Sequence, residues 1–187
     1  PLTDVAWQSL SWQEHLQNAV TDISTLVSLL GIPAESVQTP FPLLVPLPFL
    51  ARMVHGDPDD PLLRQVLPVH AELEQTDGYS LDPLRELAQS PTDGMLHKYH
   101  GRVLVIASGA CAINCRYCFR RHFPYQSFQP DTDAWQHIFD YVRRDPSITE
   151  VILSGGDPLV QTDRRLSWIA ENIAAIPHVT TLRIHTR

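Results

Sequence analysis

From residue 102 onward, the chain alternates short apolar runs with amphipathic segments of helical length. The apolar runs lie at residues 102–107, 150–153 and 180–185, and helical spacing of apolar side chains begins near residue 131 and again over residues 162–176. Strands that are separated by helices of this length are joined by right-handed crossovers and pair in parallel. The sequence therefore predicts an α/β fold in which the loops after the strands share one edge of the sheet.

The first hundred residues predict short helices that are interrupted by proline. Apolar side chains recur at helical spacing over residues 12–19 and 23–30, and Gly31 is a candidate C-cap of the second helix. Four prolines within residues 39–48 predict an extended connection. Two further helices are predicted, one over residues 48–55 and one that follows a turn within residues 56–68. We therefore predict an N-terminal helical region at residues 1–100 and a second domain at residues 101–187.

Composition narrows the class of protein. The chain has 187 residues, of which 43% are hydrophobic, so it can bury a core, and its formal net charge of −7 argues against a nucleic-acid partner. No apolar run approaches the roughly 20 residues that cross a bilayer. The first residues, PLTDVAW, lack the basic start and apolar core of a signal peptide. We predict a soluble, cytoplasmic protein without a membrane partner.

All three cysteines of the chain stand within eight residues, in the loop predicted after the first strand. They are Cys111, Cys115 and Cys118, spaced C-x3-C-x2-C. An odd and tightly clustered set is a poor disulfide framework, so it indicates metal or redox chemistry in a reducing compartment. Three thiolates can hold three irons of a [4Fe–4S] cluster, which leaves the fourth iron open to a substrate or cofactor.

Two other interpretations of the cysteines remain open at this point. The first is a structural zinc site of Cys3His type with His122 as the fourth ligand, although zinc ligands are usually paired across a larger separation. The second is a set of buried cysteines without a ligand. Chance clustering of this kind is improbable in a chain with no other cysteine, so the sequence favours the cluster.

A glycine pair follows the second predicted strand in the segment SGGDPL, residues 154–159. Gly155 and Gly156 allow the backbone to approach a ligand closely, and Asp157 adds a carboxylate. Gly-Gly-Asp-Pro is also an ordinary turn sequence. Its predicted place at the same sheet edge as the cysteines favours a shared site.

With Tyr117 immediately before its last cysteine, the cysteine loop resembles the signature of the radical S-adenosylmethionine superfamily. The resemblance implies an N-terminal helical region followed by the first βα units of a partial (β/α)6, TIM-like barrel, truncated after its third strand. It also implies that Cys111, Cys115 and Cys118 bind a [4Fe–4S] cluster. The open iron of that cluster would bind S-adenosylmethionine, whose reductive cleavage yields a 5′-deoxyadenosyl radical.

The same resemblance assigns residues around the S-adenosylmethionine. Tyr117 would lie near the adenine, and Gly155, Gly156 and Asp157 would surround the methionyl amino group. The reductive cleavage requires an external electron donor as a partner of the protein.

Four stretches, residues 57–68, 97–125, 152–159 and 182–187, resemble the lysine 2,3-aminomutase family. The form CRYCFRRHFPY is similar to the bacterial branch that makes (R)-β-lysine for elongation factor P. The resemblance implies an isomerase that moves the amino group of L-lysine from C2 to C3, with pyridoxal phosphate as a further cofactor. Arg120 matches the family arginine that binds the substrate carboxylate, a task suited to its bidentate, permanently charged head.

The chain departs from the family at the pyridoxal phosphate lysine. Such a lysine forms the resting Schiff base, and the family places it downstream of residue 187. Lys98 is the single lysine, stands before the first predicted strand, and does not match the family motif. We therefore expect the cluster half of the site without its substrate half. A glycyl-radical activase and a metal-stapled binding module that docks a partner remain alternatives. A second copy of the chain, in a homo-oligomer, is a candidate partner.

Overall fold

The computed structural model describes residues 9–33, 37, 39–125 and 130–187. The chain divides into two compact units, one of Pro1–Leu81 with Ala112–His122 and one of Asp82–Cys111 with Phe123–Arg187. The cysteine loop passes from the second unit to the first between Cys111 and Ala112. The domain boundary that we predict between residues 100 and 101 stays a prediction.

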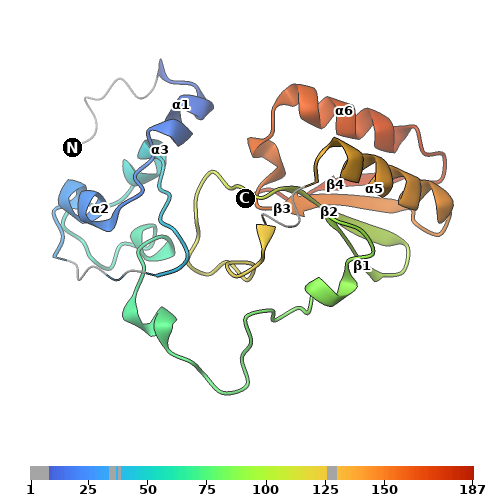
Figure 1. Cartoon of the computed structure of the whole chain (residues 1–187). Helices are drawn as coiled ribbons and strands as arrows, with labels where there is room; N and C mark the ends of the chain where they lie inside the picture. The colour runs from blue at the N-terminus through green and yellow to red at the C-terminus, as the bar shows by residue number, and fades with distance from the viewer. Residues whose placement is uncertain (1–8, 34–36, 38, 126–129) are drawn as a thin grey trace. The chain divides into compact units, whose positions relative to one another are not determined.

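The first unit is built from short helices, α1 (Trp12–Gln17), α2 (Ile23–Leu30) and α3 (Leu47–Leu50) (Figure 1). The predicted C-cap at Gly31 is confirmed, since its φ of 64° is the left-handed conformation that glycine adopts without strain. The unit has its own core of buried side chains, to which α2 and α3 contribute Leu26, Leu30 and Leu50. Of the extended connection predicted over residues 39–48, residues 39–46 contain no helix, but Leu47 and Pro48 already belong to α3.

Two helices of this region are shorter than predicted. The helix expected over residues 48–55 is the single turn α3, and the one expected within residues 56–68 is the 3-10 turn η3 (Leu63–Gln65). Asp60 explains the second difference: its buried carboxylate accepts the N–H groups of Val54, Leu62 and Leu63 at 3.0, 2.8 and 2.9 Å. The acidic residues therefore fix a turn rather than begin a longer helix. Two more 3-10 turns follow, η4 (His70–Leu73) and η5 (Leu87–Gln89).

The second unit contains a four-stranded sheet in the order β1-β2-β3-β4. Its strands are β1 (Met95–Tyr99), β2 (Arg102–Ser108), β3 (Glu150–Gly155) and β4 (Thr181–Ile184). The predicted α/β class and the parallel pairing of the last three strands are confirmed.

The strand β1 was not predicted, and it pairs antiparallel with β2. The two strands are joined by a tight turn in which Gly101 has a φ of 80°. The predicted parallel sheet is therefore extended by one antiparallel strand at its edge. Lys98 lies within β1 rather than before the first strand, and it donates to the carbonyl oxygen of Leu84 at 2.9 Å.

Two longer helices, α5 (Thr132–Arg144) and α6 (Asp163–Ala174), cover one face of this sheet (Figure 1). A cap near Asp131 or Thr132 is predicted for α5, and Asp131 is its N-cap, whose side chain accepts the Ala134 N–H. The N-cap of α6 is Thr162, whose side chain accepts the Arg165 N–H. The predicted apolar face of α5 is buried, and α6 buries its own side chains beside it. The core formed by both helices and the sheet includes Trp135, Phe139, Ile169, Ile173, Val103, Val105, Val151 and Leu153.

The edge strand β4 is exposed at every residue, as expected of a strand with no helix packed on it. Within the described ranges, no helix is both long and apolar enough to span a bilayer. The segment PLTDVAW, on which the prediction about a signal peptide rests, lies outside the described residues.

Candidate functional site

The loops that follow β2 and β3 meet within the second unit. The Gly156 N–H donates to the Ser108 carbonyl at 2.7 Å, and the Asp157 N–H donates to the Ala110 carbonyl at 2.8 Å. These bonds continue the parallel pairing of β2 with β3, in which Ser108 lies opposite Gly155. Because Cys111 follows Ala110 directly, the predicted meeting of the glycine segment with the start of the cysteine loop is confirmed.

Both glycines of this junction are required by close backbone contacts. A Cβ atom on Gly155 would lie 2.4 Å from the Ser108 carbonyl oxygen, and one on Gly156 would lie 2.2 Å from the Ala110 carbonyl oxygen. Gly155 also has a φ of 119°, which disfavours any side chain. The glycine pair therefore serves the close approach of the two loops, whatever ligand lies beside it.

Asp157 links the end of β3 to the segment after β4. Its carboxylate is 7% exposed and accepts the N–H of Leu159 at 2.9 Å and the hydroxyl of Thr186 at 2.8 Å. The N–H of Arg187 lies 3.5 Å from the other carboxylate oxygen. Asp157 is thus bonded within the protein, and its role toward a methionyl amino group stays a prediction.

Two side chains that the sequence did not single out complete this junction. The Tyr125 hydroxyl donates to the Gly155 carbonyl at 2.9 Å, and the Gln161 amide donates to the Ala107 carbonyl at 2.9 Å. Both bonds connect residues that are thirty or more positions apart. No local spacing indicates such a contact, although Tyr125 closes the segment CRYCFRRHFPY on which the family resemblance rests.

The first unit holds Cys115, Tyr117, Cys118 and Arg120. Cys115 is buried and Cys118 half-buried, while the Tyr117 ring is 67% exposed with its hydroxyl 3.4 Å from the Gln65 side-chain oxygen. The Arg120 side chain is buried, and its guanidinium carbon lies 4.8 Å from the centre of the adjacent Phe119 ring. The structure thus distributes the predicted site over both units.

Arg116 and Arg121, which stand near Arg120 in the sequence, are buried in ion pairs rather than exposed to solvent. Glu72 accepts hydrogen bonds from both Arg116 and Arg121. Burial raises the pKa of the Glu72 carboxyl, but the two arginine hydrogen bonds outweigh burial and hold that pKa below its usual value. The carboxylate is therefore charged at neutral pH.

The donor chemistry of the loop fits an iron–sulfur cluster. None of Cys111, Cys115 and Cys118 forms a disulfide, so each can supply the thiolate that such a cluster requires. Over the described part of the chain, no three Cys, His, Asp or Glu side chains are gathered closely enough to hold a metal ion. This holds for the alternative zinc set with His122 as well, so the cluster and zinc assignments rest on the donor set.

Lys98 does not fit a Schiff-base lysine. Its ammonium is bonded to a backbone carbonyl, and its Nζ lies 5.8 Å from the centre of the Tyr99 ring, which is 62% exposed. A Schiff-base lysine needs a desolvated or electrostatically tuned amine, and this amine lies at an exposed strand end. The expectation that Lys98 plays no part in pyridoxal phosphate binding is therefore supported by its surroundings.

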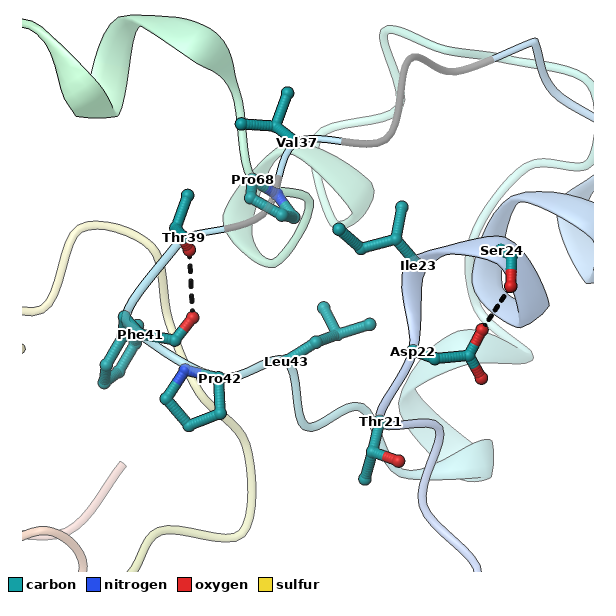
Figure 2. A pocket seen from close by; sticks show the side chains of 10 residues that line it. All are labelled: Thr21, Asp22, Ile23, Ser24, Val37, Thr39, Phe41, Pro42, Leu43 and Pro68. Atoms are coloured by element: carbon teal, nitrogen blue, oxygen red, sulfur yellow. Dashed lines mark hydrogen bonds between the residues drawn. The ribbon is translucent and has the colours of Figure 1, made fainter.

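An open pocket of about 430 Å³ lies in the first unit. Figure 2 shows its lining, which comes from the start of α2 and from the extended proline-rich segment. The lining residues are Thr21, Asp22, Ile23, Ser24, Val37, Thr39, Phe41, Pro42, Leu43 and Pro68. None of the predicted site residues is among them, although Thr39 and Phe41 also accept hydrogen bonds from Arg116 of the cysteine loop.

Comparison with known proteins finds relatives of these loops. Residues 105–187, which include all three cysteines and the glycine segment, match the model of the radical SAM superfamily. This part of the chain is similar to that superfamily, and the relatives of the chain described next are named as L-lysine 2,3-aminomutases. Those enzymes use a [4Fe–4S] cluster, S-adenosylmethionine and pyridoxal phosphate.

An L-lysine 2,3-aminomutase of Escherichia coli is 48% identical to this chain over 183 residues, which are 94% of the chain and 53% of the relative. The enzyme of the same name from Haemophilus influenzae is 41% identical, over 100% of the chain and 57% of the relative. That of Clostridium subterminale is 32% identical, over 100% of the chain and 46% of the relative. The chain thus spans about half the length of the curated relatives it matches.

Proposed function

We propose that this chain provides the cluster-binding and S-adenosylmethionine-binding part of an enzyme that converts L-lysine to β-lysine. One observation carries the proposal: in a close relative of L-lysine 2,3-aminomutases, Gly155–Asp157 bond directly to the backbone that leads into the cysteine loop. When bound, the cluster and S-adenosylmethionine supply a 5′-deoxyadenosyl radical. The four-stranded sheet would then be the beginning of a partial (β/α)6 barrel.

The residues of the chain have distinct tasks in this proposal. Cys111, Cys115 and Cys118 would each bind one iron and leave the fourth iron open. Tyr117, whose ring is largely exposed, would contact the adenine. Gly155 and Gly156, whose close backbone contacts leave no room for a Cβ atom, would border the methionyl group of S-adenosylmethionine.

Arg120 would bind the carboxylate of the lysine substrate. Its buried guanidinium can donate two parallel hydrogen bonds to a carboxylate, which gives both strength and orientation. The whole enzyme would also need pyridoxal phosphate. Because the surroundings of Lys98 do not fit a Schiff-base lysine, we assign no step that involves pyridoxal phosphate to this chain.

Three finer assignments accompany the proposal. The segment CRYCFRRHFPY supports (R)-β-lysine as the product and elongation factor P as the protein that is modified with it. The three cysteines, none of which forms a disulfide, support a reducing, cytoplasmic location. The radical chemistry requires an external electron donor.

Anaerobic reconstitution with iron and sulfide tests the proposed function. The reduced protein is expected to show the electron paramagnetic resonance signal of a [4Fe–4S] cluster, and S-adenosylmethionine is expected to change that signal because it binds the open iron. A reduced-cluster signal that stays the same with S-adenosylmethionine would refute the proposal. Cleavage of S-adenosylmethionine that depends on a protein glycine rather than on lysine would instead favour the activase.

Replacing Arg120 with alanine is expected to impair substrate use without removing the cluster. Hydrogen bonds to charged groups contribute about 1.5–3 kcal/mol, so kcat/KM for lysine should fall roughly 10- to 100-fold. The whole enzyme should keep its iron content and its signal change with S-adenosylmethionine. Steady-state kinetics with lysine measure the effect.

The matched control for this variant is Arg64→Ala, because Arg64 is an exposed arginine of the same unit. Its kcat/KM is expected to match that of the unaltered enzyme. Arg120→Lys keeps the charge but not the two-pronged geometry, so its kcat/KM should lie between the two. Full turnover of lysine by Arg120→Ala would show that the carboxylate is bound elsewhere.

A further inference from the structure

Two buried arginines stand close in sequence to Cys115 and Cys118, because Arg116 follows Cys115 directly and Arg121 comes three residues after Cys118. Arg116 binds Glu72 with two parallel hydrogen bonds, from Nε to Oε1 at 3.0 Å and from Nη2 to Oε2 at 2.5 Å. Arg121 binds the same carboxylate, from Nη2 to Oε2 at 2.5 Å. The side chains of Glu72, Arg116 and Arg121 are only 10%, 6% and 16% exposed. One carboxylate thus joins two arginines that flank Cys118.

The proline-rich segment encloses the same arginines. Arg116 donates from Nη1 to the Phe41 carbonyl at 2.9 Å and from Nη2 to the Thr39 hydroxyl at 2.6 Å. The guanidinium carbons of Arg116 and Arg121 lie 5.1 and 5.6 Å from the centre of the Phe41 ring. Figure 2 shows the bond from the Thr39 hydroxyl to the Phe41 carbonyl that fixes this segment. We call Thr39, Phe41, Glu72, Arg116 and Arg121 the arginine clamp.

The backbone around Cys115 is held by additional bonds in the same unit. The Asn114 N–H donates to the Leu44 carbonyl at 3.1 Å, and the Arg116 N–H donates to the Gln65 carbonyl at 2.8 Å. Because Cys115 stands between these two residues, both of its neighbours in the chain are anchored. Arg121 also donates to the Arg116 carbonyl at 3.2 Å, which closes the loop around Cys118.

A network of buried charges such as the arginine clamp contributes little to the free energy of unfolding. Removing three charges from water costs free energy that their mutual attraction only partly returns, and apolar side chains of similar volume often stabilise a protein more. The clamp instead fixes one geometry, because the planar arginine head accepts few alternative arrangements with its carboxylate. It also carries two positive charges against one negative charge at the cysteine loop.

We propose that Glu72 is a positioning residue for the cluster, which holds the Cys115–Cys118 segment through Arg116 and Arg121 and offsets their charge beside the cluster. The inference rests on the proposed function, since it presumes that these thiols bind the cluster. Charge and hydrogen bonding around a cluster set its reduction potential. Loss of the Glu72 charge therefore leaves two guanidinium groups that favour the more negative, reduced cluster.

Glu72→Gln in the whole protein tests the proposal with two measurements. In the protein without cluster, alkylation of Cys115 and Cys118, followed by mass spectrometry, is expected to accelerate at least tenfold, because the loop is no longer held. In the reconstituted protein, a redox titration followed by electron paramagnetic resonance should show a several-fold higher ratio of reduced to oxidised cluster at a fixed potential.

Two controls separate positioning from stability. Glu74→Gln removes the same charge from an exposed position two residues away and should change neither measurement. Leu26→Ala empties a fully buried site of the same unit, so it should lower the melting temperature without the shift in the redox titration. If Glu72→Gln changes the thiol rates and the potential no more than Leu26→Ala does, the proposal is wrong.

A second variant applies if Glu72→Gln does not fold. Thr39→Val removes the acceptor for Arg116 Nη2 but no charge, so it should accelerate alkylation and leave the potential unchanged. Unaltered alkylation in Thr39→Val would overturn the proposal. The alkylation measurement does not require a bound cluster. A protein that binds no cluster would therefore refute the proposed function. The alkylation rates would still decide whether the arginine clamp holds the cysteine loop.

Discussion

The Cys115→Ala variant is expected to bind no [4Fe–4S] cluster. Removal of one thiolate leaves a second iron without a protein ligand, and a loop with two thiolates cannot retain the cubane. Iron content after anaerobic reconstitution should fall from about four atoms per chain to near zero. The absorbance of the bound cluster and the resonance signal of its reduced form should disappear together.

The matched control for Cys115→Ala is Leu50→Ala, a variant that lowers stability without removing a thiolate. Cys115 and Leu50 belong to the same core and are 8% and 1% exposed. Leu50→Ala should cost about 2–5 kcal/mol of unfolding free energy because it leaves a cavity, yet the folded protein should retain its iron. Cys115→Ala should show the reverse, a small loss of stability and a complete loss of iron. A Cys115→Ala protein that keeps four iron atoms would disprove the assignment of Cys115 as a cluster ligand. If the unaltered protein instead contains one zinc ion per chain and no iron, the alternative zinc site would be established.

The elements that were predicted correctly are those whose local pattern agrees with their packing. The helix α5 has a cap at Asp131 and an apolar face that is buried on the sheet, so periodicity alone located it. The strand β2 is a continuous apolar run rich in β-branched residues, and from Val103 to Ser108 it is buried except at the half-buried Leu104. In such elements, side-chain spacing and tertiary burial indicate the same structure.

The elements that were missed depend on contacts that no local pattern shows. The residues of β1 include His97 and Lys98, and this strand forms because it pairs with β2 across a tight turn. Residues 56–68 contain a helical apolar pattern, but the side chain of Asp60 bonds the backbone of Val54, Leu62 and Leu63 and holds it in a turn. Here side-chain hydrogen bonds outweigh helical propensity.

The same distinction applies to the candidate site. The spacing of the cysteines and the glycine pair are short motifs, so the sequence alone located them. The partners of Arg116 lie more than forty residues away at Glu72, Phe41 and Thr39. A solvated arginine and a buried one look alike in sequence, because burial is decided by the path of the rest of the chain.

The arginine clamp also indicates that the N-terminal region helps to hold the cysteine loop. Residues 39–72 supply the carbonyl, hydroxyl and carboxylate groups that hold Asn114, Arg116 and Arg121. In the second unit, backbone bonds from the glycine segment hold Ser108 and Ala110 just ahead of Cys111. Each end of the cysteine loop is thus anchored within its own unit.

The Gly155→Ala variant is expected to disrupt the junction between β2 and β3 and the response of the cluster to S-adenosylmethionine. A Cβ atom at this position would lie 2.4 Å from the Ser108 carbonyl oxygen and 3.1 Å from the Ile106 side chain. Since the nearer atom belongs to the backbone, relief of the clash must move the strand end that leads to Cys111. We expect a loss of stability beyond the cost of the positive φ alone.

Gly78→Ala measures that backbone cost separately. Gly78 also has a positive φ, 85° against 119° for Gly155, but a Cβ atom there meets nothing within 4 Å. Urea unfolding should show a loss of about 1–2 kcal/mol for Gly78→Ala, and an additional ~1–3 kcal/mol of overpacking for Gly155→Ala. Only Gly155→Ala should also weaken the signal change that S-adenosylmethionine causes in the reduced cluster. Equal losses of stability and equal signal changes in the two variants would show that the close contact with Ser108 plays no part in the site.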